Sequence, residues 1–124
     1  MEVPILKQGA VLIATFQAAL SDADLNQLRS ALVQQVVRFR SRGVIVDVTA
    51  MDVTVANHLV QTVEASRLLG ATVIVTGLSP EIAQTLVTIG VDLGKMNTVG
   101  DLQGGIEQAE RLLGYKVAAL AEPS

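Results

Sequence analysis

Short apolar runs alternate with longer amphipathic stretches along this chain of 124 residues. The short runs are rich in Val and Ile, as in strands that are buried on both faces of a parallel sheet. The longer stretches repeat apolar residues at helical spacing and are bounded by capping residues. The order of elements is therefore ββαβαβαβα. This order predicts an α/β fold, with a mostly parallel sheet of about five strands and helices packed on it.

Local signals place the boundaries of these elements. Ser21 and Asp24 have the spacing of a capping box, and Ser79-Pro80-Glu81 combines a cap with a proline at the first helical position and an acid in the first turn. The predicted strands are Val3–Leu6, Val11–Phe16, Val44–Val48, Thr72–Thr76 and Met96–Val99, the last of them at an edge. The predicted helices begin at Ser21, Val53, Pro80 and Asp101 and end at Gly43, Gly70, Gly90 and Gly114.

One apolar stripe of each helix should face the sheet. In chain order, the stripes are Leu25, Leu28, Leu32, Val36 and Phe39; Val55, Leu59 and Val63; Ile82, Leu86 and Ile89; and Leu102, Ile106, Ala109 and Leu113. Gly104 and Gly105 would each weaken the last helix by roughly 1 kcal/mol, so we expect them to allow close packing.

The composition excludes several classes of function. Only 2% of the residues are aromatic, and 9 basic residues are dispersed along a chain of net charge −3, so no nucleic-acid surface is expected. The chain lacks cysteine, which excludes disulfides and thiol chemistry and is compatible with the cytosol. No apolar run approaches the roughly 20 residues that span a bilayer, and no signal peptide is evident. We therefore expect a cytoplasmic protein without membrane contact.

The length suits a single layered core. We expect one domain over residues 1–115. Residues 116–124, which follow the predicted stop of the last helix, should form a flexible C-terminal tail.

Catalytic machinery is not evident in the sequence. Catalysis needs an acid, a base or a nucleophile within reach of a partner. The one histidine, His58, lies on a predicted helix, and the acids Asp47, Asp52 and Asp92 are separated along the chain. The chain contains neither a Gly-x-Gly-x-x-Gly motif nor a Walker lysine motif. We therefore predict a protein that is not an enzyme and that holds no cofactor and no metal.

Threonine hydroxyls on two predicted helices are the remaining candidates for chemistry. Thr54 follows Asp52 in the first turn of a helix, where either residue could cap the helix. Alternatively, Thr54 accepts a phosphate, which the free amides and the dipole of a helix N-terminus would stabilise. Thr85 and Thr88 lie on the polar arc of the next helix, either as solvent-facing residues or as a second site of phosphorylation or partner contact.

Several segments resemble the STAS domain, which occurs in anti-sigma-factor antagonists and in stressosome scaffold proteins of the RsbS and RsbR type. The resemblance covers about residues 3 to 114. Val3–Lys7, Val44–Thr49 and Leu68–Ala71 look like the RsbS and RsbR branch. Thr76–Thr85, which reads Thr-Gly-Leu-Ser-Pro-Glu-Ile-Ala-Gln-Thr, and Val55–Leu59 look like RsbR, whereas the N-terminal half looks more like RsbS.

The resemblance implies a STAS fold and a non-enzymatic scaffold in a bacterial stress response that is controlled by a sigma factor. Such a scaffold binds a switch-type serine/threonine kinase and releases it upon phosphorylation. It associates with STAS paralogues, as a homo-oligomer or a large hetero-oligomer. Two alternatives stay open. One is a free-standing anti-anti-sigma factor that binds an anti-sigma kinase, and the other is a small nucleotide- or ligand-binding α/β domain.

The resemblance also implies positions for phosphorylation. The second site of the family corresponds to Thr85. The first corresponds to Val53, with Thr54 beside it, if the chain is aligned on the Val-Ala-Asn-His segment that follows. It corresponds to Ala56 if the loop 49–52, which looks shorter than in the family, is aligned without a gap. The residues implied in partner contact are Asp52, Val53, Asn57 and Ser79.

Overall fold

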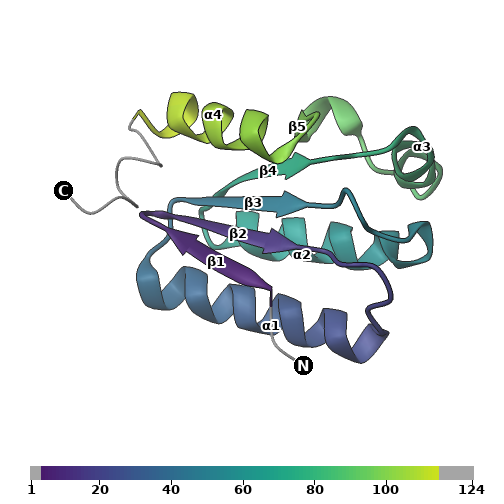
Figure 1. The fold of residues 1–124 in the computed structure, drawn as a ribbon, viewed down its shortest axis with the longest axis horizontal. Helices are drawn as coiled ribbons and strands as arrows, with labels where there is room; N and C mark the ends of the chain where they lie inside the picture. Colours follow the sequence, from purple (N-terminus) through teal and green to yellow (C-terminus); the bar gives the residue numbers. More distant parts are fainter. Residues whose placement is uncertain (1–3, 115–124) are drawn as a thin grey trace.

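A computed structural model describes residues 4–114, which form one five-stranded sheet with helices on both faces (Figure 1). The strands are β1 (Ile5–Gln8), β2 (Val11–Thr15), β3 (Gly43–Asp47), β4 (Thr72–Thr76) and β5 (Asn97–Val99). The helices are α1 (Asp22–Phe39), α2 (Ala56–Leu68), α3 (Pro80–Thr88) and α4 (Leu102–Leu113), with two short 3₁₀ turns, η1 (Val53–Val55) and η2 (Leu93–Lys95). The predicted order of strands and helices, and with it the α/β fold, is confirmed.

The strands lie in the sheet in the order in which they occur in the chain. β1 and β2 form an antiparallel pair, and every other neighbouring pair is parallel. β2, β3 and β4 are interior strands, as their Val- and Ile-rich composition predicts, and β5 is an edge strand. Because β2 to β5 are parallel, their carboxyl ends meet at one end of the sheet, where α/β proteins concentrate their binding sites.

The helices form a layer on each face of this sheet. α1 and α2 lie side by side on one face, α4 packs on β3 and β4 on the other face, and α3 lies at the carboxyl ends of the strands (Figure 1). The larger core contains Phe16, Leu28 and Leu59, between the sheet and the pair α1 and α2. The smaller core joins Ile45 and Ile74 to α4.

The two glycines of α4 allow the close packing that the sequence predicts. A Cβ atom at Gly105 would overlap the Cγ2 atom of Thr76, and one at Gly104 would lie 2.5 Å from the Cγ1 atom of Val99. The helix therefore rests directly on β4 and β5, and this packing offsets the low helix propensity of glycine.

The end of α1 differs from the prediction. Arg40, in the left-handed conformation with φ 49°, is the C-cap, so the helix ends before the predicted stop at Gly43. Gly43 is the first residue of β3. A Cβ atom there would lie 3.1 Å from Leu113 Cδ1 and 3.3 Å from Val11 Cγ2. The glycine thus serves the packing of α4 against the sheet and not the end of a helix.

Two apolar residues predicted to face inward are exposed. Phe39 is 41% exposed and Ile89 is 47% exposed. Each lies where its helix ends, Phe39 as the last residue of α1 and Ile89 as the C-cap of α3, beyond the part of the helix that covers the core. The ring of Phe39 lies instead beneath the cations of Lys7 and Arg38.

The helix predicted from Val53 begins as the 3₁₀ turn η1, and its α-helical part begins at Ala56. All three residues of η1 are β-branched, which disfavours the α-helical conformation. The first strand starts at Ile5, whereas residue 3 lies outside the described residues. The predicted domain end at residue 115 and the predicted tail 116–124 also lie outside them.

Candidate functional site

The loops that follow β3 and β4 are joined to each other by hydrogen bonds. Asp47 at the end of β3 accepts hydrogen bonds from the hydroxyls of Thr49, at 2.8 Å, and of Thr76, at 2.9 Å. The backbone N–H of Val48 donates to the carbonyl of Thr76 at 2.9 Å. Gly77 has φ +75° and lies so close to Thr49 that a Cβ atom would overlap the hydroxyl. The two loops therefore have one fixed relative position, from which η1 and α3 begin.

The start of η1 is capped by Asp52. Its carboxylate accepts a hydrogen bond from the backbone N–H of Thr54 at 2.9 Å. Hydrogen bonds from the backbone and the side chain of Thr54 hold the pKa of the Asp52 carboxyl below its ordinary value. The backbone hydrogen bond confirms the capping interpretation of Asp52, and Asp52 and Thr54 are both exposed.

Val53 and Ala56, the two residues that alternative alignments place at the first phosphorylation position, both serve packing. Val53 is half-buried and contacts the larger core, and Ala56 is 3% exposed. A side chain at position 56 would thus be out of reach of a partner. On this helix start, Thr54 and Asn57 are exposed.

Ser79 caps α3, as the sequence predicts. Its hydroxyl accepts a hydrogen bond from the backbone N–H of Ile82 at 3.2 Å, and Pro80 follows at the first helical position. Thr85 is half-buried, and its hydroxyl donates to the carbonyl of Glu81 at 2.9 Å. Thr88 is exposed and makes the same kind of bond to the carbonyl of Gln84 at 2.9 Å. Both threonine hydroxyls are therefore bound to their own helix.

The predicted site residues from the two segments lie on one end of the molecule. α3 packs against both η1 and α2, so the turn that carries Thr54 and the helix that carries Thr85 are neighbours (Figure 1). Asp52, Asn57 and Ser79 belong to these same elements. The structure thus brings the candidate residues together at the carboxyl ends of β3 and β4.

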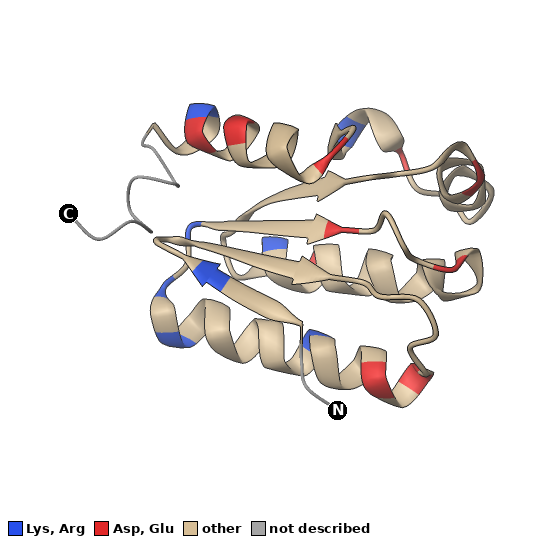
Figure 2. Cartoon of the chain, in the orientation of Figure 1, with Lys and Arg blue, Asp and Glu red and all other residues tan. Residues whose placement is uncertain are grey.

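Charge is unevenly distributed between the two ends of the sheet (Figure 2). The end that bears the candidate site carries the acids Asp22, Asp24, Asp47, Asp52 and Glu81. The opposite end, where α1 terminates, carries Arg38, Arg40 and Arg42. Acids at helix starts and cations at helix ends complement the helix dipoles. The resulting field at the candidate site favours a partner with a positively charged surface.

One contact at this end was not predicted from the sequence. His58 Nε2 lies 2.9 Å from Asp22 Oδ1, which joins the start of α1 to the start of α2. The His58 side chain is 15% exposed, and its Nδ1 atom finds no hydrogen-bond partner among the described residues. No spacing signal could have revealed the pair, because 36 positions separate its members.

Within residues 4–114, no group of three or more His, Cys, Asp or Glu side chains is placed to hold a metal ion. Over the same range, no helix is both long enough and apolar enough to cross a membrane.

Comparison with known proteins identifies the family. Residues 2–101 match the STAS domain. This chain belongs to the STAS domain family. It is 42% identical over 94 residues to the RsbT co-antagonist protein RsbRA of Bacillus subtilis, a match that covers 73% of this chain and 34% of that protein. A second relative, RsbRD of the same organism, is 37% identical over 51 residues, which cover 41% of this chain and 18% of RsbRD. The chain thus corresponds to a minor part of either relative.

Solved structures of STAS proteins have the same fold. A serine-to-glutamate variant of RsbS from Moorella thermoacetica is 28% identical, with a TM-score of 0.82 over 92% of this chain and 99% of RsbS. A chain of the stressosome, a signal integration and transduction hub, is also 28% identical, with a TM-score of 0.79 over 89% of this chain and 98% of that one. The anti-sigma factor antagonist SpoIIAA, at 13% identity and a TM-score of 0.65, shares the fold alone. The resemblance to stressosome STAS proteins is therefore confirmed.

Proposed function

We propose that this chain is a non-catalytic STAS scaffold of a cytoplasmic stressosome. It binds a switch-type serine/threonine kinase at the end of the sheet where η1 and α3 meet, and phosphorylation of Thr85 releases the kinase. The observation that carries the proposal is the contact between η1 and α3. This contact gathers both candidate threonines on a surface whose loops are held in place by Asp47.

Thr85 is the better switch because a phosphate on it would change the structure. Its hydroxyl donates to the carbonyl of Glu81, and this bond is lost when the hydroxyl is esterified. The phosphate would carry a charge of about −2 in the last turn of α3, where the helix dipole disfavours negative charge. Phosphorylation should therefore loosen the end of α3.

Thr54 is the weaker candidate. A phosphate there would lie beside the carboxylate of Asp52, which already accepts the free N–H of Thr54. Repulsion between the two negative groups opposes the stabilisation that a helix start otherwise gives to a phosphate. Val53, the neighbouring family position, has no hydroxyl to phosphorylate.

The first experiment is incubation with the cognate kinase and ATP, followed by mass spectrometry of peptides. We expect phosphate on Thr85 and its loss in Thr85→Ala. Thr88→Ala is the matched control, because Thr88 lies on the same helix, is exposed and makes the same type of hydrogen bond. Phosphate found only on Ser21, Ser41 or Ser66 would contradict the assignment. Ser41 and Ser66 are buried, and Ser21 is occupied as the cap of α1.

Binding to the kinase tests the release step separately. We expect Thr85→Glu to weaken kinase binding by roughly tenfold or more, a change of about 1.4 kcal/mol. Thr88→Glu, one turn nearer the helix end and more exposed, should have a smaller effect. Equal weakening by both variants would mean that a negative charge at any position in the last turn of α3 is sufficient and that Thr85 has no special place.

Particle size tests the assembly. With STAS paralogues present, size-exclusion chromatography with light scattering should detect a large hetero-oligomer. A monomer or dimer under all conditions would favour the free-standing anti-anti-sigma factor instead.

A further inference from the structure

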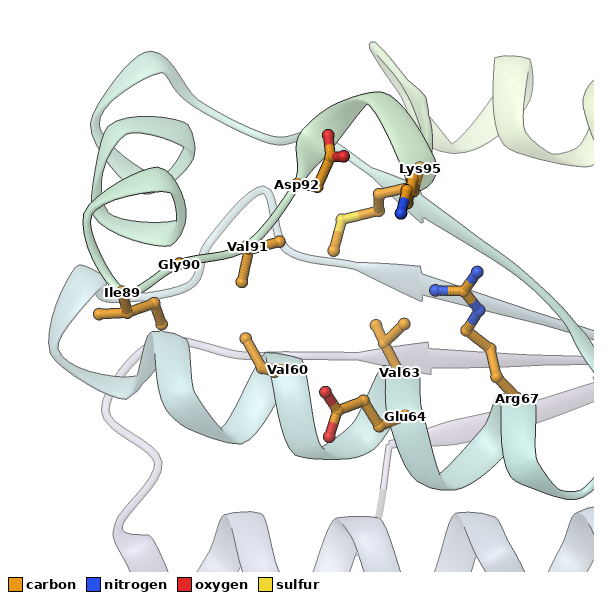
Figure 3. Close-up of a pocket in the computed structure, with 10 residues that line it drawn as sticks. Val60, Val63, Glu64, Arg67, Ile89, Gly90, Val91, Asp92 and Lys95 are labelled. Carbon is orange, nitrogen blue, oxygen red and sulfur yellow. The ribbon is translucent and has the colours of Figure 1, made fainter.

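A cavity of about 310 Å³ lies between α2 and the segment that follows α3 (Figure 3). Its apolar lining is formed by Val60 and Val63 of α2 and by Val91 and Met96. Val63 is 3% exposed, so the floor of the cavity is part of the larger core. The volume lies at the lower end of the range for small-molecule sites, about 300–1,000 Å³.

Two cations extend over this apolar floor. Arg67 of α2 and Lys95 of η2 both line the cavity, and the side chain of Arg67 extends from α2 towards η2 (Figure 3). Neither side chain has a hydrogen bond or an ion pair within the described residues. Two unpaired cations beside an apolar wall form a site whose charge is complementary to an anion.

The two carboxylates in the lining do not neutralise this pair. Asp92 Oδ1 accepts a hydrogen bond from the backbone N–H of Gly94 at 2.9 Å, as the cap of η2. Asp92 and Glu64 both point away from the guanidinium of Arg67 (Figure 3). The part of the cavity between Arg67 and Lys95 is therefore locally cationic.

We propose that this cavity binds a small organic anion. The anionic head, a carboxylate or a phosphate monoester, lies between Arg67 and Lys95. A body of a few carbon atoms lies on Val60, Val63 and Val91. The proposal is independent of kinase binding.

The cavity also contacts the helix that carries Thr85. Ile89 and Gly90 form part of its wall, and the backbone N–H of Ile89 donates to the carbonyl of Thr85 at 3.1 Å. A bound anion would thus hold the end of α3 against α2.

The test is titration of the purified chain with hexanoate, hexyl phosphate and hexanamide, followed by calorimetry and by two-dimensional NMR of the backbone amides. Hexanamide has the same apolar body and no charge. We expect saturable binding of at least one of the two anions, with shifts centred on Arg67, Val91 and Lys95. Comparison of the two anions identifies the preferred head group.

Arg67→Gln and Lys95→Gln should each weaken binding by roughly tenfold, since each removes a charge-assisted hydrogen bond. Arg111→Gln is the matched control, because it removes an exposed cation from α4 on the other face of the sheet. It should leave binding unchanged. Equal binding of hexanamide, equal weakening by all three variants, or no saturable binding of either anion would overturn the proposal.

Discussion

Asp47 should contribute more to stability than its place at the end of a strand suggests. Its carboxylate accepts from Thr76, which is fully buried, and from Thr49, which is exposed. Asp47→Ala leaves the buried hydroxyl without its acceptor, at a cost of about 1–3 kcal/mol, and removes the exposed bond, worth about 0.5 kcal/mol. We expect a total loss of about 1.5–3.5 kcal/mol. Asp47→Asn, which retains an acceptor oxygen, should lose about 1 kcal/mol or less.

Urea unfolding of a double-mutant cycle measures this coupling directly. In a Thr76→Val background the buried hydroxyl is absent, so Asp47→Ala should cost about 1–3 kcal/mol less than in the parent chain. In a Thr49→Val background, the corresponding difference should be about 0.5 kcal/mol or less, because solvent replaces the exposed bond. If Asp47→Ala costs the same in the Thr76→Val background as in the parent, the hydrogen bond to Thr76 does not stabilise the fold, and the reasoning is wrong.

Two further predictions concern packing and pH. Gly105→Ala should destabilise the fold by about 1–3 kcal/mol despite its better helix propensity, because its methyl group meets Thr76. Gly100→Ala, whose Cβ atom meets nothing within 4 Å, is the neutral control, and equal unfolding midpoints would contradict the packing argument. The pKa of Asp52 is lower in the folded chain than in the unfolded chain. Its carboxylate therefore stabilises the fold at pH values above its ordinary pKa of about 4. This stabilisation is lost as the pH falls through the lowered pKa. Asp52→Ala should therefore be less stable than the parent at pH about 6, and the difference should shrink towards pH about 3. Thermal unfolding at the two pH values checks this, and an unchanged difference would contradict it.

The interior strands and the starts of α1, α3 and α4 could be predicted because their signals are local. Two-sided Val- and Ile-rich runs become the buried interior strands, and the Ser79-Pro80 pair becomes the cap and first residue of α3. Gly104 and Gly105 have low helix propensity but lie within a predicted helix. Their presence there correctly predicts close packing.

The remaining features depend on where distant segments meet. Arg40 adopts the left-handed conformation that a sequence argument reserves for glycine, so Gly43 was wrongly predicted to end the helix. The contact between His58 and Asp22 joins α1 to α2, and the hydrogen bond between Thr76 and Asp47 joins β4 to β3. Asp47 was evident in the sequence only as a polar residue near the end of an apolar strand.

If the proposed function holds, the charge of a phosphate at the candidate site strengthens kinase binding, whereas the change of conformation that the phosphate causes weakens it. The acidic end of the sheet attracts a cationic partner surface, and a phosphate there would add negative charge and strengthen that attraction. Release of a kinase therefore requires a change of shape that outweighs the added attraction. The change is available at Thr85, where phosphorylation removes the bond to Glu81 and places negative charge in the last turn of α3. Because surface attraction is screened by salt and helix loosening is not, the effect of Thr85 phosphorylation on binding should persist or increase as the salt concentration rises.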